Sequence, residues 1–376
     1  MSKLAEKKIL CIVGARPNFM KIAPVIRALN NAQHSFNVRL LHTGQHYDAV
    51  MKQSFFDQLN IPEPDVDLGV GSGSHAVQTA EIMKRFEPVM DELKPDTILV
   101  VGDVNSTIAC ALVAVKKGVP VIHVEAGLRS GDRSMPEEIN RVLTDQISDL
   151  LLTTERSAEA NLLREGICAD KVHFVGNVMI DTLRYNLSNA VSAEETVSSC
   201  QITVDTSLGY GLLTLHRPAN VDDPAVLERL LRTLVDLAKH LPLLFPVHPR
   251  TRQCIESAGL NQLVANSQLH LIPPQAYLNM LGLMKGARLV LTDSGGIQEE
   301  TTALGVPCIT LRENTERPIT VAEGSNTIVG SSPEKIKSCF DDIMQSGGKA
   351  GCTPEYWDGK AAERIAEVIG NWLHKT

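Results

Sequence analysis

The stretch Leu289-Val-Leu-Thr-Asp-Ser-Gly-Gly-Ile-Gln-Glu-Glu300 decides the fold class of this chain. Its apolar start, Leu289–Leu291, is typical of a strand that is covered on both faces. The small residues Ser294, Gly295 and Gly296 then predict a turn that opens a helix, and their backbone N–H groups can approach a diphosphate closely. The stretch therefore indicates a strand, a turn and a helix in an α/β chain.

Similar apolar runs recur along the whole sequence. They are continuous rather than alternating, as expected for buried parallel strands. The first set comprises Ile9–Val13, Val38–Leu41, Ile98–Val101, Val119–Val124, Asp149–Thr154 and Val172–Val175. The second set comprises Leu212–Leu215, Leu243–Val247, Leu269–Ile272, Leu289–Leu291, Pro307–Leu311 and Thr327–Val329.

Segments with helical spacing lie between these runs. Residues 226–241 place Leu side chains on one apolar face, with Asp223 as the predicted N-cap and Pro224 in the first turn. A second apolar face is predicted for Ile139, Val142, Leu143 and Ile147. The alternation of strands and helices predicts parallel sheets.

The strand series is interrupted once, by the polar residues 181–208. At 376 residues the chain is long enough for about two domains. We therefore expect a Rossmann-like domain over residues 1–180, a linker region over 181–208 and a second Rossmann-like domain over 209–358. Residues 359–376 are predicted as a C-terminal helix that packs back on the first domain. A ligand cleft is expected between the two domains.

Composition excludes several classes of protein. The net charge of −8 gives no general electrostatic footprint for nucleic acid. The eight cysteines are scattered, so neither a disulfide scaffold nor a metal site is predicted. Residues 1–8 lack the apolar core of a signal peptide, and no run of 18 apolar residues predicts a membrane span. We expect a soluble cytoplasmic protein.

Ligands bind at the carboxyl ends of strands in an open parallel sheet, so the residues after each strand are the candidates. Gly14-Ala15-Arg16-Pro17-Asn18-Phe19-Met20-Lys21 follows the first strand, and Arg16 and Lys21 would suit a phosphate near a helix N-terminus. The alternative is a turn with surface cations.

Four carboxylates follow the next strands. Asp103 and Glu125 come at the ends of their strands, and Glu137 and Glu138 begin a helix. The alternative roles are helix capping for the cluster around Asp103 and complementing the helix dipole for the two glutamates.

In the second half, His216 and Arg217 follow a strand, and His216 is a proton-transfer candidate. Glu300 lies one turn into the helix after Ser294–Gly296, where it can accept hydrogen bonds from ribose hydroxyls. The sequence contains no P-loop, and no convincing G-x-G-x-x-G follows the first strand, so hydride transfer by that route is not supported.

Taken together, the motifs resemble those of the non-hydrolysing UDP-N-acetylglucosamine 2-epimerase family, which is related to GT-B-type glycosyltransferases. They appear in family order between residue 14 and about residue 318. The matching pieces are GARPNFMK, GDVNST, HVEAGLRS, MPEEINR, GNVMIDTL, LTLHRPAN, PVHPR, LTDSGGIQEE and NTERP.

The resemblance implies a reaction and a set of roles. The reaction is reversible inversion at C2 of UDP-N-acetylglucosamine (UDP-GlcNAc) to UDP-N-acetylmannosamine, by anti-elimination of UDP through 2-acetamidoglucal, with no nicotinamide or other cofactor. Asp103, Glu125 and Glu137 would be the acid/base carboxylates, and His216 would assist the departure of UDP. Residues implied to hold UDP or to lie close to it are Arg16, Lys21, Arg217, Ser294, Gly295, Gly296, Glu300 and Arg317. The family also implies a homodimer with its contact in the first domain.

Several alternatives stay open at this stage. Thr43-Gly44-Gln45-His46-Tyr47-Asp48 departs from the A-Q-H-R pattern of the well-known bacterial members, where this region forms an activating UDP-GlcNAc site. The form found here also resembles epimerases of UDP-2,3-diacetamido-2,3-dideoxy-glucuronate, the runner-up substrate. A GT-B-type glycosyltransferase, a hydrolytic variant and a nucleotide-sugar sensor are further alternatives. Which carboxylate serves which face of C2 and which polysaccharide pathway uses the product are not decided.

Overall fold

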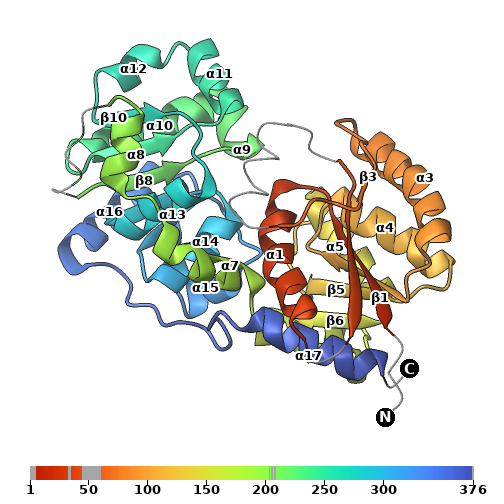
Figure 1. The fold of residues 1–376 in the computed structure, drawn as a ribbon. Helices are drawn as coiled ribbons and strands as arrows, with labels where there is room; N and C mark the ends of the chain where they lie inside the picture. Colours follow the sequence, from red (N-terminus) through yellow and green to blue (C-terminus); the bar gives the residue numbers. More distant parts are fainter. Residues whose placement is uncertain are drawn as a thin grey trace. The chain divides into compact units, whose positions relative to one another are not determined.

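The computed structural model describes residues 6–32, 35–44, 61–202, 204, 206 and 209–374, without the side chain of Arg16. The chain divides into two compact units, one of Met1–Tyr185 with Glu355–Thr376 and the other of Asn186–Pro354. Each unit has its own parallel sheet with helices against it, so the structure confirms an α/β fold of two Rossmann-like units (Figure 1).

The first unit contains a sheet of seven strands in the order β3-β2-β1-β4-β5-β6-β7. The strands are β1 (Lys7–Val13), β2 (Phe36–His42), β3 (Val66–Asp67), β4 (Thr97–Val101), β5 (Val121–Ala126), β6 (Leu150–Thr153) and β7 (Val172–Phe174). The helices are α1 (Arg16–Asn30), α3 (His75–Leu93), α4 (Asn105–Lys116), α5 (Pro136–Ile147), α6 (Arg156–Arg164), α7 (Val178–Asn186) and α17 (Ala361–Leu373).

The second unit contains a sheet of six strands in the order β10-β9-β8-β11-β12-β13. The strands are β8 (Gly211–Thr214), β9 (Leu243–Pro246), β10 (Leu269–Ile272), β11 (Leu289–Thr292), β12 (Cys308–Thr310) and β13 (Asn326–Ile328). The helices are α8 (Ala193–Ser199), α9 (Pro218–Val221), α10 (Pro224–Ala238), α11 (Pro249–Ser257), α12 (Asn261–Ala265), α13 (Tyr277–Gly286), α14 (Gly295–Leu304), α15 (Pro318–Ala322) and α16 (Pro333–Ser346).

Every predicted apolar run corresponds to a strand, and the ends of run and strand agree within two residues. The short strand β3 was not predicted, because two residues give no recognisable run. The helix over 226–241 is confirmed as α10: Asp223 caps it, and its Leu face is buried in the core of the second unit.

In each sheet the chain first adds strands on one side of its first strand and then crosses over to add strands on the other side. In the first unit this switch point lies between β1 and β4, and in the second between β8 and β11. The crevice at the carboxyl ends of such a strand pair is where open α/β sheets bind ligands. The residues that follow these four strands are therefore the ones to inspect.

The prediction for α5 was wrong about which face is buried. Ile139 and Leu143 are 43% and 49% exposed, whereas the polar residues Glu138, Arg141 and Asp145 are buried. The helix lies with its polar face toward the strand ends, because those residues hydrogen-bond and pair with groups there. Of its apolar residues, Ile139 and Leu143 are left on the surface of the unit, while Ile147 packs against the core.

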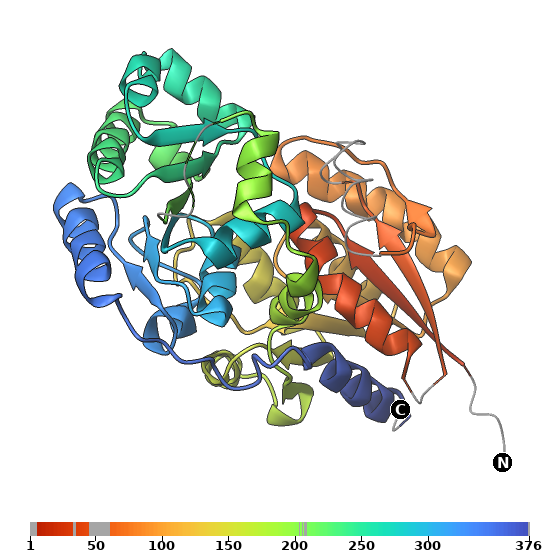
Figure 2. The ribbon, with the colours of Figure 1, turned by 60° about the vertical axis from the view of Figure 1, so that its left-hand side comes forward.

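Residues 181–208, treated above as a linker, include the end of α7 and all of α8. Helix α8 packs on α13 of the second unit, where Asn279 donates a hydrogen bond of 3.1 Å to the Thr196 hydroxyl. The chain returns to the first unit at Glu355, and α17 lies along α1 (Figures 1 and 2). Asp181 caps α17 by accepting hydrogen bonds from the amides of Ala361 and Ala362, at 3.1 and 2.7 Å.

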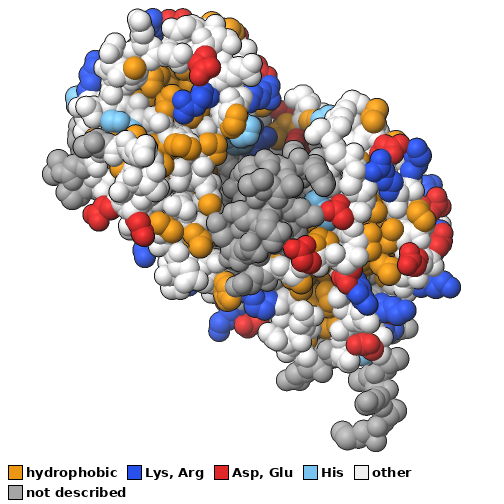
Figure 3. Space-filling model, turned by 45° about the horizontal axis from the view of Figure 1, so that its top comes forward, with side chains coloured by type: hydrophobic (Ala, Val, Ile, Leu, Met, Phe, Trp, Pro, Cys, Tyr) orange, Lys and Arg blue, Asp and Glu red, His pale blue; other side chains and the backbone are white. Residues whose placement is uncertain are grey.

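Basic and acidic side chains are interspersed over the described part of the face seen in Figure 3. Among the described residues, no helix is both long enough and apolar enough to cross a bilayer.

Candidate active site

The turn after β1 is fixed to the end of β4 by one buried side chain. Asn18, 2% exposed, accepts hydrogen bonds from the amides of Gly14 and Ala15 and donates one of 2.9 Å to the carbonyl of Val101. Only glycine fits at position 14, because a Cβ there would lie 2.0 Å from the Ser106 hydroxyl. This arrangement places the start of α1, and with it Arg16, at the switch point.

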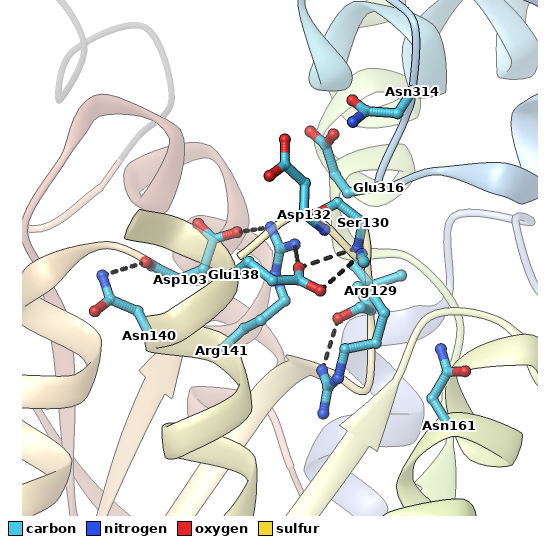
Figure 4. Close-up of polar contacts among 12 residues, drawn as sticks. Asp103, Arg129, Ser130, Asp132, Glu138, Asn140, Arg141, Asn161, Asn314 and Glu316 are labelled. Atoms are coloured by element: carbon cyan, nitrogen blue, oxygen red, sulfur yellow. Dashed lines mark hydrogen bonds and ion pairs between the residues drawn. The ribbon is translucent and has the colours of Figure 1, made fainter. Parts of the chain in front are cut away.

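Asp103 lies just beyond β4, and two side chains of α5 contact it, one at its carboxylate and one at its backbone carbonyl (Figure 4). Arg141, 4% exposed, approaches the Asp103 carboxylate to 2.5 Å and also pairs with Glu138. The amide of Asn140 donates a hydrogen bond of 2.9 Å to the backbone carbonyl of Asp103. The carboxylate is thus oriented by a buried cation, and α5 is what positions it.

Glu125 is the penultimate residue of β5 and has a strained backbone conformation. Its φ is 73°, in the left-handed region that non-glycine residues rarely adopt, and the pairing with β6 shifts register there. Its carboxylate lies 2.5 Å from Nζ of Lys21, and both residues are buried. Strain of this kind costs about 1–3 kcal/mol and is concentrated at functional sites. The geometry makes Lys21 the partner of Glu125.

The two glutamates at the start of α5 have different surroundings. Glu138 is buried and accepts hydrogen bonds from the amides of Ser130 and Gly131, at 3.0 and 2.9 Å. Burial alone would raise its pKa, but these bonds and Arg141 outweigh burial and lower the pKa. Glu137 is partly exposed and has no hydrogen-bond or ion-pair partner among the described residues. Glu138 therefore has a structural role, and Glu137 is the one left available to a ligand.

A buried carboxylate in the second unit organises the loop that carries His216. Asp293 follows β11 and is fully buried, and it accepts hydrogen bonds from the backbone amides of His216 and Arg217 and from the Asn220 side chain. Burial would raise the pKa of Asp293, but bonds from His216, Arg217 and Asn220 keep it below its usual value. Nδ1 of His216 lies 2.9 Å from this carboxylate. The carboxylate therefore fixes the proton on Nδ1, and Nε2, for which the described part of the chain supplies no partner, can contact a ligand.

Positive charge gathers at the start of α14. A Cβ on Gly295 would lie 2.4 Å from Oε1 of Glu316, so the glycine allows that carboxylate to approach the helix closely. Burial opposes the ionisation of Glu316, but Arg312, Arg317 and Arg217 outweigh it and lower the pKa of Glu316 to about 2. Arg312 lies 2.9 Å and Arg217 3.9 Å from Glu316. An anion is therefore already stable beside the N-terminus of this helix.

The remaining predicted residues lie close by. Ser294 precedes α14 and donates its amide hydrogen to the Thr292 hydroxyl at 2.9 Å, and Gly296 is the second residue of the helix. Arg317 is only 6% exposed, and its Nε lies 3.2 Å from Glu299. The pairing holds Arg317 against α14, and its predicted contact with UDP stays a prediction.

Glu300 is a buried carboxyl group whose pKa is raised. It is 4% exposed, and the Tyr277 hydroxyl donates a hydrogen bond of 3.0 Å to Oε1. Burial and the charge of Glu299 raise the pKa of Glu300 to about 8, although the bond from Tyr277 lowers it. The side chain is therefore mostly neutral at pH 7, which is unusual for a glutamate and typical of a functional site.

Sequence reasoning did not single out four residues on which this geometry depends: Asn18, Arg141, Tyr277 and Asp293. Asp293 stands at a strand end and was recognisable by that position, but the others act through partners far away in the sequence. Gln45, His46 and Tyr47, on which the question of activation depends, lie outside the described residues. Within the described part of the chain, no three His, Cys, Asp or Glu side chains are grouped to hold a metal ion.

Comparisons with known proteins agree with this arrangement. The sequence profile described as UDP-N-acetylglucosamine 2-epimerase matches residues 27–370. A UDP-N-acetylglucosamine 2-epimerase of Methanococcus maripaludis is 42% identical over 365 residues, which cover 96% of this chain and 98% of the relative. A UDP-2,3-diacetamido-2,3-dideoxy-D-glucuronate 2-epimerase of Pseudomonas aeruginosa is 40% identical over 369 residues, covering 96% and 99%. The crystal structure of Methanocaldococcus jannaschii UDP-GlcNAc 2-epimerase in complex with UDP-GlcNAc and UDP shares 42% identity and a TM-score of 0.87, covering 97% and 99%.

Proposed function

The chain belongs to the UDP-N-acetylglucosamine 2-epimerase family, and we propose that it interconverts UDP-GlcNAc and UDP-N-acetylmannosamine by inversion at C2. The observation that carries this proposal is the set of carboxylates at one end of the first sheet. Asp103 and Glu125 each have a buried cation as partner, and Glu137 is available beside them. Inversion requires one group that removes the C2 proton and another that returns a proton to the opposite face.

The chemistry of the sugar explains why UDP leaves during the reaction. The C2 proton is poorly acidic, so its transfer to a carboxylate is helped when the C1–O bond breaks and its electron pair departs with UDP. The product of this elimination is 2-acetamidoglucal, with a C1–C2 double bond. A second carboxyl group then protonates C2 from the other face, and a phosphate oxygen of UDP adds back to C1. Asp103, Glu125 and Glu137 are the proposed acid/base groups.

The second unit supplies the groups that would hold UDP while it is detached. The amides of Gly295 and Gly296 and the side chain of Arg217 suit the diphosphate, and the family resemblance implies that Ser294 and Arg16 contribute as well. Nε2 of His216 is positioned by Asp293 to stabilise the oxygen that leaves C1. Glu300 suits the ribose hydroxyls.

Isotope exchange tests the proposed function directly. Purified protein incubated with UDP-GlcNAc in D2O should incorporate deuterium at C2 and form UDP-N-acetylmannosamine, without accumulating free sugar. Absence of exchange at C2, with and without added UDP, would eliminate UDP-GlcNAc as the substrate. Release of free N-acetylmannosamine and UDP would show the hydrolytic variant instead.

The second candidate is 2-epimerisation of UDP-2,3-diacetamido-2,3-dideoxy-glucuronate. The specific observation in its favour is the Pseudomonas aeruginosa relative, which is 40% identical over nearly its full length. The Thr43–Asp48 sequence, which resembles that of such epimerases, also favours this substrate. Parallel measurement of kcat/KM for the two UDP-sugars decides between them, because the better substrate has the larger value.

We also propose a homodimer formed through the first unit. Ile139 and Leu143 of α5 and Val77 of α3 are exposed. The two helices meet at Asn105, to which His75 and Asn140 are hydrogen-bonded. Leu143→Lys should convert a dimer to a monomer in light scattering. Leu163→Lys, at a residue of α6 with 50% exposure, is the matched control and should leave the dimer intact. A monomeric wild-type protein would refute the proposal.

A cytoplasmic location is part of the same proposal. None of the eight cysteines forms a disulfide, which suits a reducing compartment. The expected product supplies polysaccharide biosynthesis with an N-acetylmannosamine donor. Cell fractionation with an antibody to the protein tests the location.

A further inference from the structure

A fully buried pair, His123 and Asp145, joins β5 to α5 in the first unit. The side chains of both residues have no exposed surface. Nδ1 of His123 lies 2.7 Å from Asp145, and Nε2 lies 2.8 Å from the backbone carbonyl of Gly102. Neither residue takes part in the proton transfers proposed above.

The hydrogen-bond partners fix the number of protons on the ring of His123. The carbonyl of Gly102 can only accept, so Nε2 must carry a hydrogen. Asp145 also accepts a hydrogen bond of 3.1 Å from the amide of Gly127 and lies 2.8 Å from the guanidinium of Arg129. These donors favour an ionised carboxylate, which can only accept from Nδ1. His123 is therefore an imidazolium with hydrogens on both nitrogens.

The pair contacts both segments that carry proposed acid/base groups. Gly102 directly precedes Asp103, and its φ of 68° allows the chain to turn there. The carbonyl of Gly102 accepts a hydrogen bond from His123, and its amide donates one of 3.1 Å to the carbonyl of Val124. Both polar backbone groups of Gly102 are thus held by β5.

The segment after Glu125 is held by the other end of the pair. Asp145 accepts from the amide of Gly127, and Asn161 donates a hydrogen bond of 3.0 Å to the carbonyl of Gly127. Gly127 has a φ of 80°, and a Cβ there would lie 2.5 Å from the carbonyl oxygen of Ala158. The strained backbone of Glu125 therefore persists because the residues on its C-terminal side are fixed.

We propose that His123 is a positioning residue of the epimerase: its doubly protonated ring connects Gly102 to Asp145 and so sets the distance between the Asp103 and Glu125 carboxylates. The proposal rests on the proposed function of the chain. The ring needs both N–H groups, because a neutral ring would leave either Gly102 or Asp145 without its donor.

Three variants and one control test this role. His123→Ala removes both donors, and His123→Gln keeps a donor that can reach Gly102. Asp145→Asn keeps the size of the side chain but removes its charge. His173→Gln makes the same chemical change on β7 of the same sheet and serves as the control. The measurements are kcat and KM for C2 exchange, the dissociation constant of UDP, and nitrogen-15 NMR of histidine-labelled protein.

His123→Ala is expected to lower kcat about 100-fold, the loss typical of a small misplacement of reacting groups, with KM and UDP binding nearly unchanged. His123→Gln should recover about tenfold of that loss, because it restores the bond to Gly102. Asp145→Asn should resemble His123→Ala, and His173→Gln should match the wild type. In the wild-type spectrum, both ring nitrogens of His123 should give the shift of a protonated nitrogen.

Other results overturn the inference and are distinct from failure of the proposed function. A folded His123→Ala protein with wild-type kcat refutes the positioning role. If His123→Ala fails to fold, a His123→Gln protein whose kcat and KM equal the wild-type values refutes it instead, as does an unprotonated ring nitrogen in the wild-type spectrum. If the wild-type protein exchanges C2 of neither UDP-sugar, the proposed function fails, and the NMR result still decides the protonation of His123.

Discussion

Replacement of Glu300 by Gln should remove a proton that the enzyme releases when it binds UDP. Burial raises the pKa of Glu300 to about 8, so its carboxyl group is mostly neutral in the free enzyme at pH 7. Two ribose hydroxyls would donate hydrogen bonds to this group, and such bonds favour the ionised form. Binding of UDP is therefore expected to lower the pKa of Glu300 and to expel its proton.

The number of protons released follows from the pKa of Glu300. At pH 7 a group with a pKa of about 8 is about 90% protonated, so binding should release about 0.9 proton. Ionisation at pH 7 costs about 1.4 kcal/mol, one pKa unit, which weakens UDP binding about tenfold relative to pH 9. Glu300→Gln has no carboxyl group to ionise and should lose both effects.

Calorimetric titration with UDP in buffers of different ionisation enthalpy measures the protons released. The phosphate of UDP contributes equally to wild type and Glu300→Gln, so the difference between the two proteins isolates Glu300. Tyr277→Phe is the matched variant: it removes the bond that lowers the pKa of Glu300, so at pH 8 it should release more protons than the wild type. Equal proton release by wild type and Glu300→Gln at pH 7 would refute the reasoning.

The other predictions concern turnover and stability. Asp103→Asn, Glu125→Gln and Glu137→Gln should each lower kcat for C2 exchange by about 100-fold or more while UDP binding, measured by calorimetry, stays nearly unchanged. The pKa of Glu316 is lowered to about 2, because its arginines outweigh burial. Glu316 should therefore contribute about 3 kcal/mol of stability above pH 4.5, and this contribution is lost as the pH falls toward 2. Hydrogen exchange of α14 in the wild type and in Glu316→Gln measures the loss. Asp181 shows the opposite pH dependence, because burial raises its pKa to about 6. Its contribution of about 3 kcal/mol to stability, present below pH 4, should be lost as the pH rises through 6. Asp181→Asn should abolish this dependence in urea unfolding followed by the fluorescence of the buried Trp357.

Each of these predictions has a result that contradicts it. Carboxylate variants that lose UDP binding together with their folded spectrum would support a structural role for those residues. Equal opening free energies of α14, obtained from amide protection factors at pH 3 and pH 6, would show that Glu316 is not ionised by its arginines. An Asp181→Asn protein that keeps the wild-type pH dependence would assign that dependence to another group.

The sequence alone determined every strand except the two-residue β3, the parallel pairing of the strands and the residues that stand at their ends. These properties are local, because a buried strand needs a continuous apolar run and a strand-to-helix turn needs small residues next to it. Asp103, Glu125, His216 and Ser294 could therefore be found from their positions after strands. The composition of α5 was misleading, because an apolar stripe does not reveal whether the core or another surface covers it.

Only the tertiary structure decided what each of these groups can do. The ion pairs of Asp103 with Arg141 and of Glu125 with Lys21 join residues far apart in the sequence, and the sheet order brings them together. The raised pKa of Glu300 depends on burial, which no local pattern determines. The charge state and direction of a side chain depend on neighbours supplied by several elements at once. The sequence therefore identified the candidate residues, and the packing of strands and helices assigned their partners and protonation.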